Sequence, residues 1–332
     1  MLALCPGAEL GEAKRWPAEH YAKVAEIKIR AGWQVWLFGS QKDAPGGEEI
    51  REWVTPGFEE DVCNLAGRTS LAEAIDHWVG RGYRVVAADA RGHGLSPRWT
   101  PAELDRAGEQ LVDDVVTVLT DLADEARGRA ALGLPAAPPP VLVGHSMGAA
   151  TAMVVAGRHP ELVSGAVLGD PARFGSRTPD ELRARGAARA RARATEVADL
   201  PATAARALAD PDVPDVEALP GAWASQRTDP TLLVTGVVAP EVPWEEGMGA
   251  LRVPTLLVTG DRRGSARVGP EGLSVLERVA NPCVETVLVP GAGHDVRRTR
   301  PVGFYTAVDP WLRRILDRSR DRIVIIAGDP EH

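Results

Sequence analysis

The sequence predicts an α/β fold with a doubly wound, mostly parallel sheet. Short apolar runs of strand length alternate with longer segments whose apolar residues recur at helical spacing. Several of the apolar runs end in Gly or Gly-Asp, and the carboxyl ends of parallel strands are where such folds place their functional groups. The 332 residues suffice for one large α/β domain or two smaller ones.

The first 76 residues are expected to form three strand–helix units. Thr69 and Ser70 are residue types that cap helix N-termini, and they precede the third helix. The expected strands are residues 2–5, 33–38 and 62–65, and the expected helices are residues 17–29, 48–54 and 71–79.

The main part of the sheet is expected between residues 77 and 319. A Pro-rich linker at residues 133–140 delivers the chain to one of its strands. The expected strands are residues 83–89, 141–143, 165–171, 254–261 and 285–290, and the flanking helices are residues 101–126, 149–156 and 304–316.

Two further segments stand apart from this alternation. Residues 172–244 are Ala-, Arg- and Pro-rich with a helical pattern, and the arginines there are expected to form a solvated face. Residues 231–236 repeat the hexapeptide Thr-Leu-Leu-Val-Thr-Gly of residues 255–260, and one repeat of this length predicts no repeat architecture. The tail at residues 322–329 is expected to form a short strand.

The stretch from Gly144 to Gly148 carries the clearest chemical signal. It reads Gly-His-Ser-Met-Gly, which fits G-x-S-x-G, and it separates the strand at 141–143 from the helix at 149–156. In such a strand–turn–helix setting Ser146 is expected on a sharp, exposed turn as a nucleophile. Both glycines are needed because a Cβ at either position would meet the neighbouring strand or helix.

The N-terminal segment, about residues 1–76, resembles the nucleotide-sugar-binding half of lipopolysaccharide heptosyltransferase II. The resemblance implies that Lys14 would face the phosphates of a sugar-nucleotide donor. The family's acceptor-side domain and its Asp-Ser-Gly-x-x-His loop are absent, which favours a scaffold role over a working glycosyltransferase. The residues that carry the resemblance are 4–9, 13–21, 32–40 and 64–71.

From about residue 77 to residue 319 the chain resembles the α/β-hydrolases. Ala90-Arg91-Gly92-His93-Gly94-Leu95-Ser96 matches the loop after that family's fourth strand, and Gly144–Gly148 matches its nucleophile elbow. The resemblance implies a core formed by residues 77–171 and 245–319. It also implies a helical lid at residues 172–244, with residues 320–332 left as a tail.

A serine hydroxyl needs a general base and an oriented acid to act as a nucleophile. In the hydrolase family the histidine after the last strand is the base, which selects His294. Asp261, at the end of the strand before His294, is the preferred acid, and Asp170 is the alternative because its strand end also points toward the site. The order Ser146, Asp261, His294 is that of the family's triad. The other histidines considered are His93, His145 and His159.

The oxyanion hole is expected to combine two backbone donors. One is the N–H of Met147, the residue after the nucleophile. The family takes the other from a His-Gly loop that this chain lacks, so the amides of Gly67 or Arg68 are preferred as substitutes, with residues 38–40 as a second choice. Because both parent folds are parallel βαβ sheets and can share the helix at 71–79, one continuous sheet is expected.

Composition limits the classes of partner. A net charge of −8 and a pI near 5.5 do not favour nucleic acid or an anionic membrane. No apolar run reaches the ~20 residues that span a bilayer. The N-terminus lacks signal-peptide features, and three widely spaced cysteines suit a reducing compartment. We therefore expect a cytoplasmic protein with neither a metal nor a cofactor.

The sequence therefore predicts a serine hydrolase that cleaves small-molecule carboxylic esters through a Ser-His-Asp triad and an acyl-enzyme. Three alternatives remain open. A C–C or lactone hydrolase, or a cofactor-free haloperoxidase-like enzyme, would share the triad. The chain could instead be a non-catalytic or weakly active fusion, or residues 1–76 could bind a nucleotide sugar. The oligomeric state is not predicted.

Overall fold

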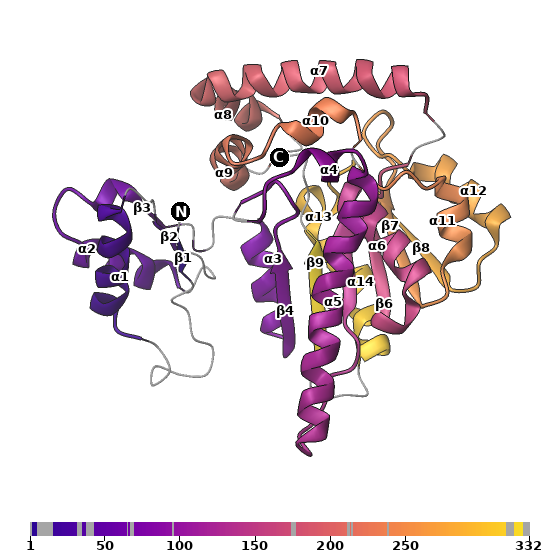
Figure 1. The fold of residues 1–332 in the computed structure, drawn as a ribbon, viewed down its shortest axis with the longest axis horizontal. Helices are drawn as coiled ribbons and strands as arrows, with labels where there is room; N and C mark the ends of the chain where they lie inside the picture. The colour runs from indigo at the N-terminus through magenta and orange to yellow at the C-terminus, as the bar shows by residue number, and fades with distance from the viewer. Residues whose placement is uncertain are drawn as a thin grey trace. The chain divides into compact units, whose positions relative to one another are not determined.

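The computed structural model divides the chain into two compact units, Met1–Gly82 and Tyr83–His332 (Figure 1). The residues described are 2–4, 16–31, 35–37, 43–64, 66, 70–94, 96–173, 177–210, 213, 215–237, 239–316 and 322–327.

The first unit contains a three-stranded parallel sheet in the order β1-β2-β3. Helices α1 and α2 pack against each other, and apolar residues of both helices and of β2 and β3 form its core. The elements are β1 (Leu2–Leu4), α1 (Ala18–Arg30), β2 (Val35–Leu37), α2 (Ala44–Trp53), a 3₁₀ turn (Glu59–Asp61), β3 (Val62–Asn64) and α3 (Ser70–Val79).

The second unit is built on a six-stranded, all-parallel sheet in the order β4-β9-β5-β6-β7-β8. Strands β5, β6 and β7 are almost completely buried, as expected for parallel strands covered on both faces. The strands are β4 (Tyr83–Ala88), β5 (Val141–His145), β6 (Gly165–Gly169), β7 (Thr255–Gly260), β8 (Val284–Val289) and β9 (Arg322–Ala327).

Helices cover both faces of this sheet. In the view of Figure 1, α5 and α6 lie in front of the strands and α14 lies behind them. Helix α6 is buried from its first residue to Ala156, because it follows directly from the central strand β5. The flanking elements are α4 (Pro101–Leu104), α5 (Ala107–Ala131), α6 (Ser146–Arg158), a 3₁₀ turn (Pro160–Leu162), α12 (Gly269–Val279), α13 (Val296–Thr299) and α14 (Pro301–Leu316).

Between β6 and β7 the chain forms a helical insertion, which we define as α7–α11. Helices α7–α10 gather at one end of the sheet (top in Figure 1), and α11 packs against α6 and α12. The N–H of Asp229 donates to the carbonyl of Gly92 at 2.6 Å, so the insertion contacts the loop after β4 at the carboxyl ends of the strands. The helices are α7 (Pro179–Ala198), α8 (Leu200–Ala209), α9 (Asp215–Gln226), α10 (Thr231–Thr235) and α11 (Trp244–Ala250).

The predicted fold class is confirmed, but the prediction of one continuous sheet is wrong. Strands β1–β3 form their own sheet, separate from the six strands of the second unit. The physical reason lies in the tail. Strand β9 pairs with β4 on one side and with β5 on the other, so it occupies the position next to the central strands that the N-terminal strands were expected to fill.

Strand β9 is the strand expected in the tail, and it belongs to the main sheet, although the tail lies outside the hydrolase pattern of the sequence. Ile323, Val324 and Ile325 are buried, and β9 is six residues long, whereas β1, β2 and β3 have three residues each. A six-residue strand rich in β-branched side chains can match the length of β4 and fill a position buried on both faces.

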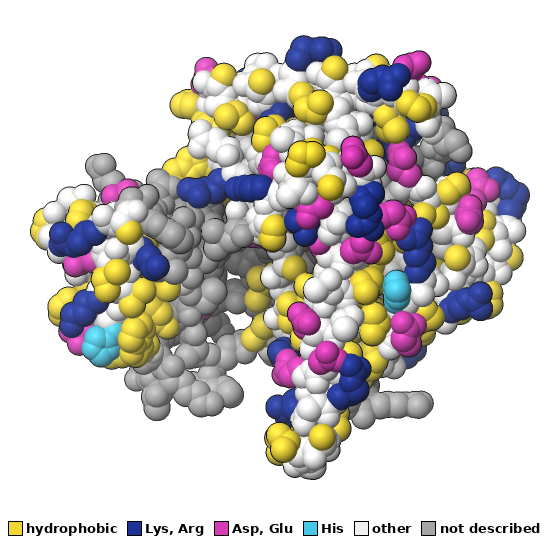
Figure 2. Space-filling view, viewed as in Figure 1, with side chains coloured by type: hydrophobic (Ala, Val, Ile, Leu, Met, Phe, Trp, Pro, Cys, Tyr) yellow, Lys and Arg dark blue, Asp and Glu magenta, His cyan; other side chains and the backbone are white. Residues whose placement is uncertain are grey.

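Charges of both signs are interspersed on the face of the molecule that Figure 2 shows, where Lys and Arg side chains alternate with Asp and Glu. In the Arg-rich helix α7, Arg183 pairs with Asp180, and Arg193 lies 3.5 Å from Glu196. Within the described part of the chain, no helix is both long enough and apolar enough to cross a bilayer.

Candidate active site

Ser146 stands at the junction of β5 and α6, as the G-x-S-x-G pattern predicts. It is the first residue of α6, its φ is 49°, and only 3% of its surface is exposed. A positive φ is sterically costly for a residue with a side chain, and such strain is found where function requires it. A Cβ at Gly144 would overlap the backbone of Gly148, so the turn closes only with glycine there.

His294 lies in the loop between β8 and α13, and its imidazole reaches the elbow. Its Nε2 is 2.9 Å from Ser146 Oγ, and its Nδ1 is 2.6 Å from Asp170 Oδ2. Because a carboxylate only accepts, the partners assign the proton of a neutral imidazole to Nδ1 and leave Nε2 to accept the serine proton. The three side chains form a continuous hydrogen-bonded chain.

Asp170 follows the last residue of β6 and is fully buried, with 0% exposure and a φ of 38°. Besides His294, its Oδ2 accepts the N–H of Arg267 at 2.8 Å. Its Oδ1 accepts the hydroxyl of Thr259 at 2.6 Å and the N–H of Val268 at 3.0 Å. Each oxygen thus accepts two hydrogen bonds, which fixes the plane of the carboxylate against the imidazole.

Asp261, the acid preferred from the sequence, does not occupy this position. Its Oδ1 accepts the N–H of Gly291 at 2.7 Å and so braces the turn that precedes His294. Asp170 follows β6, which pairs directly with the elbow strand β5, and Asp261 follows β7, one strand further away. Of the two carboxylates, that of Asp170, the alternative acid, is the one hydrogen-bonded to His294 Nδ1, whereas that of Asp261 is engaged by the turn before His294.

The predicted oxyanion donors are only partly described. Met147 is buried in the first turn of α6, where backbone N–H groups have no intrahelical acceptor and are available to a ligand. Gly67 and Arg68 lie outside the described residues, and so do Lys14 and residues 38–40. Of the predicted donors, the structure thus places Met147 beside Ser146.

Some contributors to the site carried no clear sequence signal. The hydroxyl of Ser265 accepts the N–H of His294 at 3.1 Å, and Thr259, inside β7, donates to Asp170. Arg267 acts through its backbone N–H, so its residue type carries no information. A polar residue at the end of an apolar strand, as in Thr259-Gly260-Asp261, was the one local hint.

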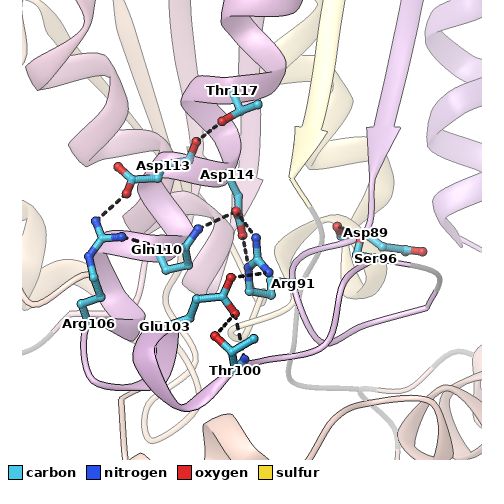
Figure 3. A network of polar contacts seen from close by, with 10 residues as sticks. All are labelled: Asp89, Arg91, Ser96, Thr100, Glu103, Arg106, Gln110, Asp113, Asp114 and Thr117. Carbon is cyan, nitrogen blue, oxygen red and sulfur yellow. Dashed lines mark hydrogen bonds and ion pairs between the residues drawn. The ribbon is translucent and has the colours of Figure 1, made fainter.

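The loop after β4 is tied to α4 and α5 by a polar network around Arg91 (Figure 3). The guanidinium donates to Asp114 through Nε and Nη2 at 2.8 and 2.7 Å, and Nη1 lies 3.0 Å from Glu103. The hydrogen bonds that Arg91 donates to Asp114, together with the charges of both carboxylates, raise the pKa of Arg91 above its ordinary value. Ser96 also donates to the carbonyl of Asp89 at 2.7 Å. This network holds the loop that the helical insertion contacts.

We expect Arg91→Ala to lower the free energy of unfolding by about 2–3 kcal/mol, because it leaves two partly buried carboxylates without their shared partner. Arg314→Ala is the matched control, since it breaks an ion pair with Glu285 whose side chains are about half exposed. Such exposed pairs contribute about 0–1 kcal/mol. Urea denaturation of both variants measures the two changes in the free energy of unfolding. Equal changes would contradict the prediction, because the Arg91 network would then stabilise the fold no more than an exposed ion pair does.

The fold and site together define a class, namely an all-parallel α/β enzyme with its serine on a strand–helix elbow beside a His-Asp pair. The chain belongs to the alpha/beta hydrolase family, whose model matches residues 65–307. The model of glycosyltransferase family 9 (heptosyltransferase) matches residues 1–89. The two matches overlap at residues 65–89, the segment that holds the helix expected to be shared by both parents.

The curated relatives agree with this division. Lipooligosaccharide heptosyltransferase 2 of Haemophilus influenzae is 55% identical over 76 residues, which are 23% of this chain and 22% of the relative. The chain thus spans about a fifth of the heptosyltransferases that it matches. The mouse sn-1-specific diacylglycerol lipase ABHD11 is 30% identical over 263 residues, which cover 73% of this chain and 75% of the relative.

Among solved structures, NosK from Streptomyces actuosus is 27% identical with a TM-score of 0.49, covering 75% of this chain and 93% of that one.

Proposed function

We propose that the protein is a serine hydrolase that cleaves carboxylic esters with an apolar acyl or alcohol part. The observation that carries the proposal is the hydrogen-bonded chain from Ser146 through His294 to Asp170. A hydrolase is what the family membership supports, and the geometry of these three side chains supports the serine mechanism in particular.

In the proposed reaction Ser146 Oγ attacks the ester carbonyl while His294 Nε2 takes its proton. Asp170 holds the imidazole in the required tautomer and stabilises its charged form. The N–H of Met147 donates to the oxyanion of the tetrahedral intermediate. His294 then gives its proton to the leaving alcohol. Water, activated by the same imidazole, releases the acid from the acyl-enzyme.

The apolar surroundings of the elbow support the substrate class. Met147 and Ala150 of α6 belong to a buried cluster with Trp99, Leu232 and Ala239. Leu232 lies on α10, so the helical insertion contributes to the apolar surface next to the nucleophile, and we propose that it acts as a lid. The mouse relative is named for the cleavage of diacylglycerol, an ester with long apolar acyl chains.

The test combines covalent labelling with a substrate panel. A fluorophosphonate probe should label Ser146, and p-nitrophenyl esters of increasing acyl length should be hydrolysed. Ser146→Ala should abolish labelling and lower kcat by about 10⁶-fold, since the nucleophile acts together with its base. Turnover that persists in Ser146→Ala would contradict the proposal. Labelling without ester turnover would favour the weakly active fusion, and cleavage of lactones alone would favour the lactonase alternative.

A further inference from the structure

The side chain of His145, next to the nucleophile, contacts the loop that carries His294. Its Nε2 lies 2.9 Å from the carbonyl oxygen of His294, and the two imidazole rings are 4.6 Å apart between centroids. Because a carbonyl oxygen only accepts, Nε2 of His145 carries the proton of this hydrogen bond. The backbone of His294 is thus held by the elbow as well as by its own loop.

A chain of charged side chains extends from this contact into the helical insertion. Asp295 Oδ1 lies 3.8 Å from His145 Nε2 and 3.5 Å from Arg298 Nη1. On the other side of its guanidinium, Arg298 Nε lies 3.0 Å from Glu217 Oε2 of α9. Arg298 belongs to α13, the four-residue helix just after His294, so one guanidinium joins α9 to the loop beside the nucleophile.

The ion pair between Arg298 and Glu217 is more deeply buried than a typical surface ion pair. The side chains of Arg298 and Glu217 are 18% and 13% exposed. Solvent and salt screen such a pair less than an exposed pair, and loss of one partner leaves a partly desolvated charge. The network can therefore hold α9 in position.

Helix α9 is also held just beyond its other end. Arg98 Nη1 donates to the carbonyl of Arg227 at 2.9 Å, and the Asp229 carboxylate accepts the N–H of Trp99 at 3.1 Å. Glu217 lies in the first turn of α9, and Arg227 follows its last residue. The helix therefore joins the loop after β4 to the loop after β8. Of these two anchors, the Arg298 anchor is the one that also contacts the histidine loop.

We propose that Arg298 is a positioning residue that couples the seating of α9 to the placement of His294, and so makes catalysis depend on how the insertion accommodates a long acyl chain. This rests on the proposed function, because the coupling matters only if His294 serves Ser146. When α9 is displaced, Glu217 leaves Arg298. The guanidinium then no longer holds Asp295 in place beside His145, and the carbonyl of His294 loses part of its support.

The test uses Arg298→Gln and Glu217→Gln in the full chain, with Arg314→Gln as the matched control. Arg314 pairs with Glu285 through side chains that are 57% and 51% exposed, and neither belongs to the site. We expect Arg298→Gln to lower kcat for short esters about tenfold, and to raise KM for long esters about tenfold. Glu217→Gln should raise KM for long esters and also lower kcat for short ones, by less than Arg298→Gln does, and Arg314→Gln should change neither.

Two further measurements separate coupling from a loss of stability. In the double variant the KM effects of Glu217→Gln and Arg298→Gln should not multiply, since both break the same contact. Arg298→Lys, which keeps the charge, should restore part of kcat. The coupling would be overturned if the KM change in the double variant equalled the product of the two single changes. It would also be overturned if Arg298→Gln had the same kcat and KM as Arg314→Gln. If the Arg298→Gln variant does not fold, the effects of Glu217→Gln on KM for long esters and on kcat for short esters decide the question.

The rate of fluorophosphonate labelling keeps the two proposals distinct. If the wild-type protein is not labelled at Ser146, the proposed function fails. If the wild-type protein is labelled and hydrolyses esters while Glu217→Gln and Arg298→Gln match it in KM and kcat, only the coupling through Arg298 fails.

Discussion

Replacement of Asp170 by Asn is expected to lower kcat for ester hydrolysis by about 10⁴-fold, the loss typical when the acid of a Ser-His-Asp triad becomes an amide. The carboxylate of Asp170 accepts the Nδ1 proton of His294. An amide nitrogen at the same place would donate instead, which would force the proton to Nε2 and leave Ser146 without a base. Initial rates on a short p-nitrophenyl ester, with active sites counted by fluorophosphonate, measure this effect.

The same substitution also tests how firmly Asp170 is held. The carboxylate of Asp170 accepts four hydrogen bonds, from His294, from Thr259 and from the backbone N–H groups of Arg267 and Val268. An Asn side chain can accept only through its one oxygen. In either orientation its NH₂ group therefore faces groups that also donate. The thermal midpoint should therefore fall together with kcat, and rates should be measured well below it.

Asp261→Asn is the matched control. Asp261 accepts one hydrogen bond from the N–H of Gly291, and the amide oxygen of Asn can keep it. We expect kcat to stay within about tenfold of the wild-type value, because only the bracing of the turn before His294 is altered. A 10⁴-fold loss in Asp261→Asn with a mild effect in Asp170→Asn would restore Asp261 as the catalytic acid.

The choice between these two aspartates shows where the sequence stops being informative. Asp170 and Asp261 each follow a Gly at the end of an apolar strand, and either one satisfies the chain order Ser, Asp, His. What separates them is the long-range contact each makes, since Asp170 accepts from His294 whereas Asp261 accepts from the N–H of Gly291. Ser146 and His294, the proposed nucleophile and base, could be singled out because their signals are local, namely a tight Gly-x-Ser-x-Gly turn and a loop histidine.

Local sequence was ambiguous even for secondary structure. The hexapeptide Thr-Leu-Leu-Val-Thr-Gly forms α10 at Thr231–Thr235, where Gly236 ends the helix with a φ of 74°. The same residues form the fully buried strand β7 at Thr255–Gly260. At β7, pairing with β6 and β8 decides the outcome, whereas α10 is partly exposed and has no strand partner among the described residues. Tertiary context overrides propensity for so short a segment.

The tail is the third case, and its placement has the largest consequence. A strand can be predicted from the β-branched run at residues 323–326, but its partners cannot, because β4 and β5 lie far away in sequence. The structure places β9 between them. The residues at the far end of the chain thus support the strand that positions Ser146, and the integrity of the site should depend on them.

A chain that ends after Leu316 is therefore expected to lose the native fold of the second unit and all labelling of Ser146. The truncation removes Ile323, Val324 and Ile325, which are 3%, 0% and 3% exposed. Burial of one such side chain contributes about 1.5–3 kcal/mol, so their combined loss is comparable to the whole stability of a domain, about 5–15 kcal/mol. It also leaves the facing N–H and C=O groups of β4 and β5 without their partners in the middle of a sheet.

Two matched variants make this prediction specific to β9. A chain that ends after Ala327 keeps the whole strand and should retain a cooperative thermal transition. Ile325→Asp keeps the full length but places a charge at a buried position between two strands, and it should unfold the second unit almost as completely as the truncation. Near-UV circular dichroism and fluorophosphonate labelling report the outcome. If β5 is displaced, Ser146 cannot keep its 2.9 Å contact with His294. Labelling of the chain that ends after Leu316 at the wild-type rate would therefore contradict the prediction and show that the elbow forms without β9.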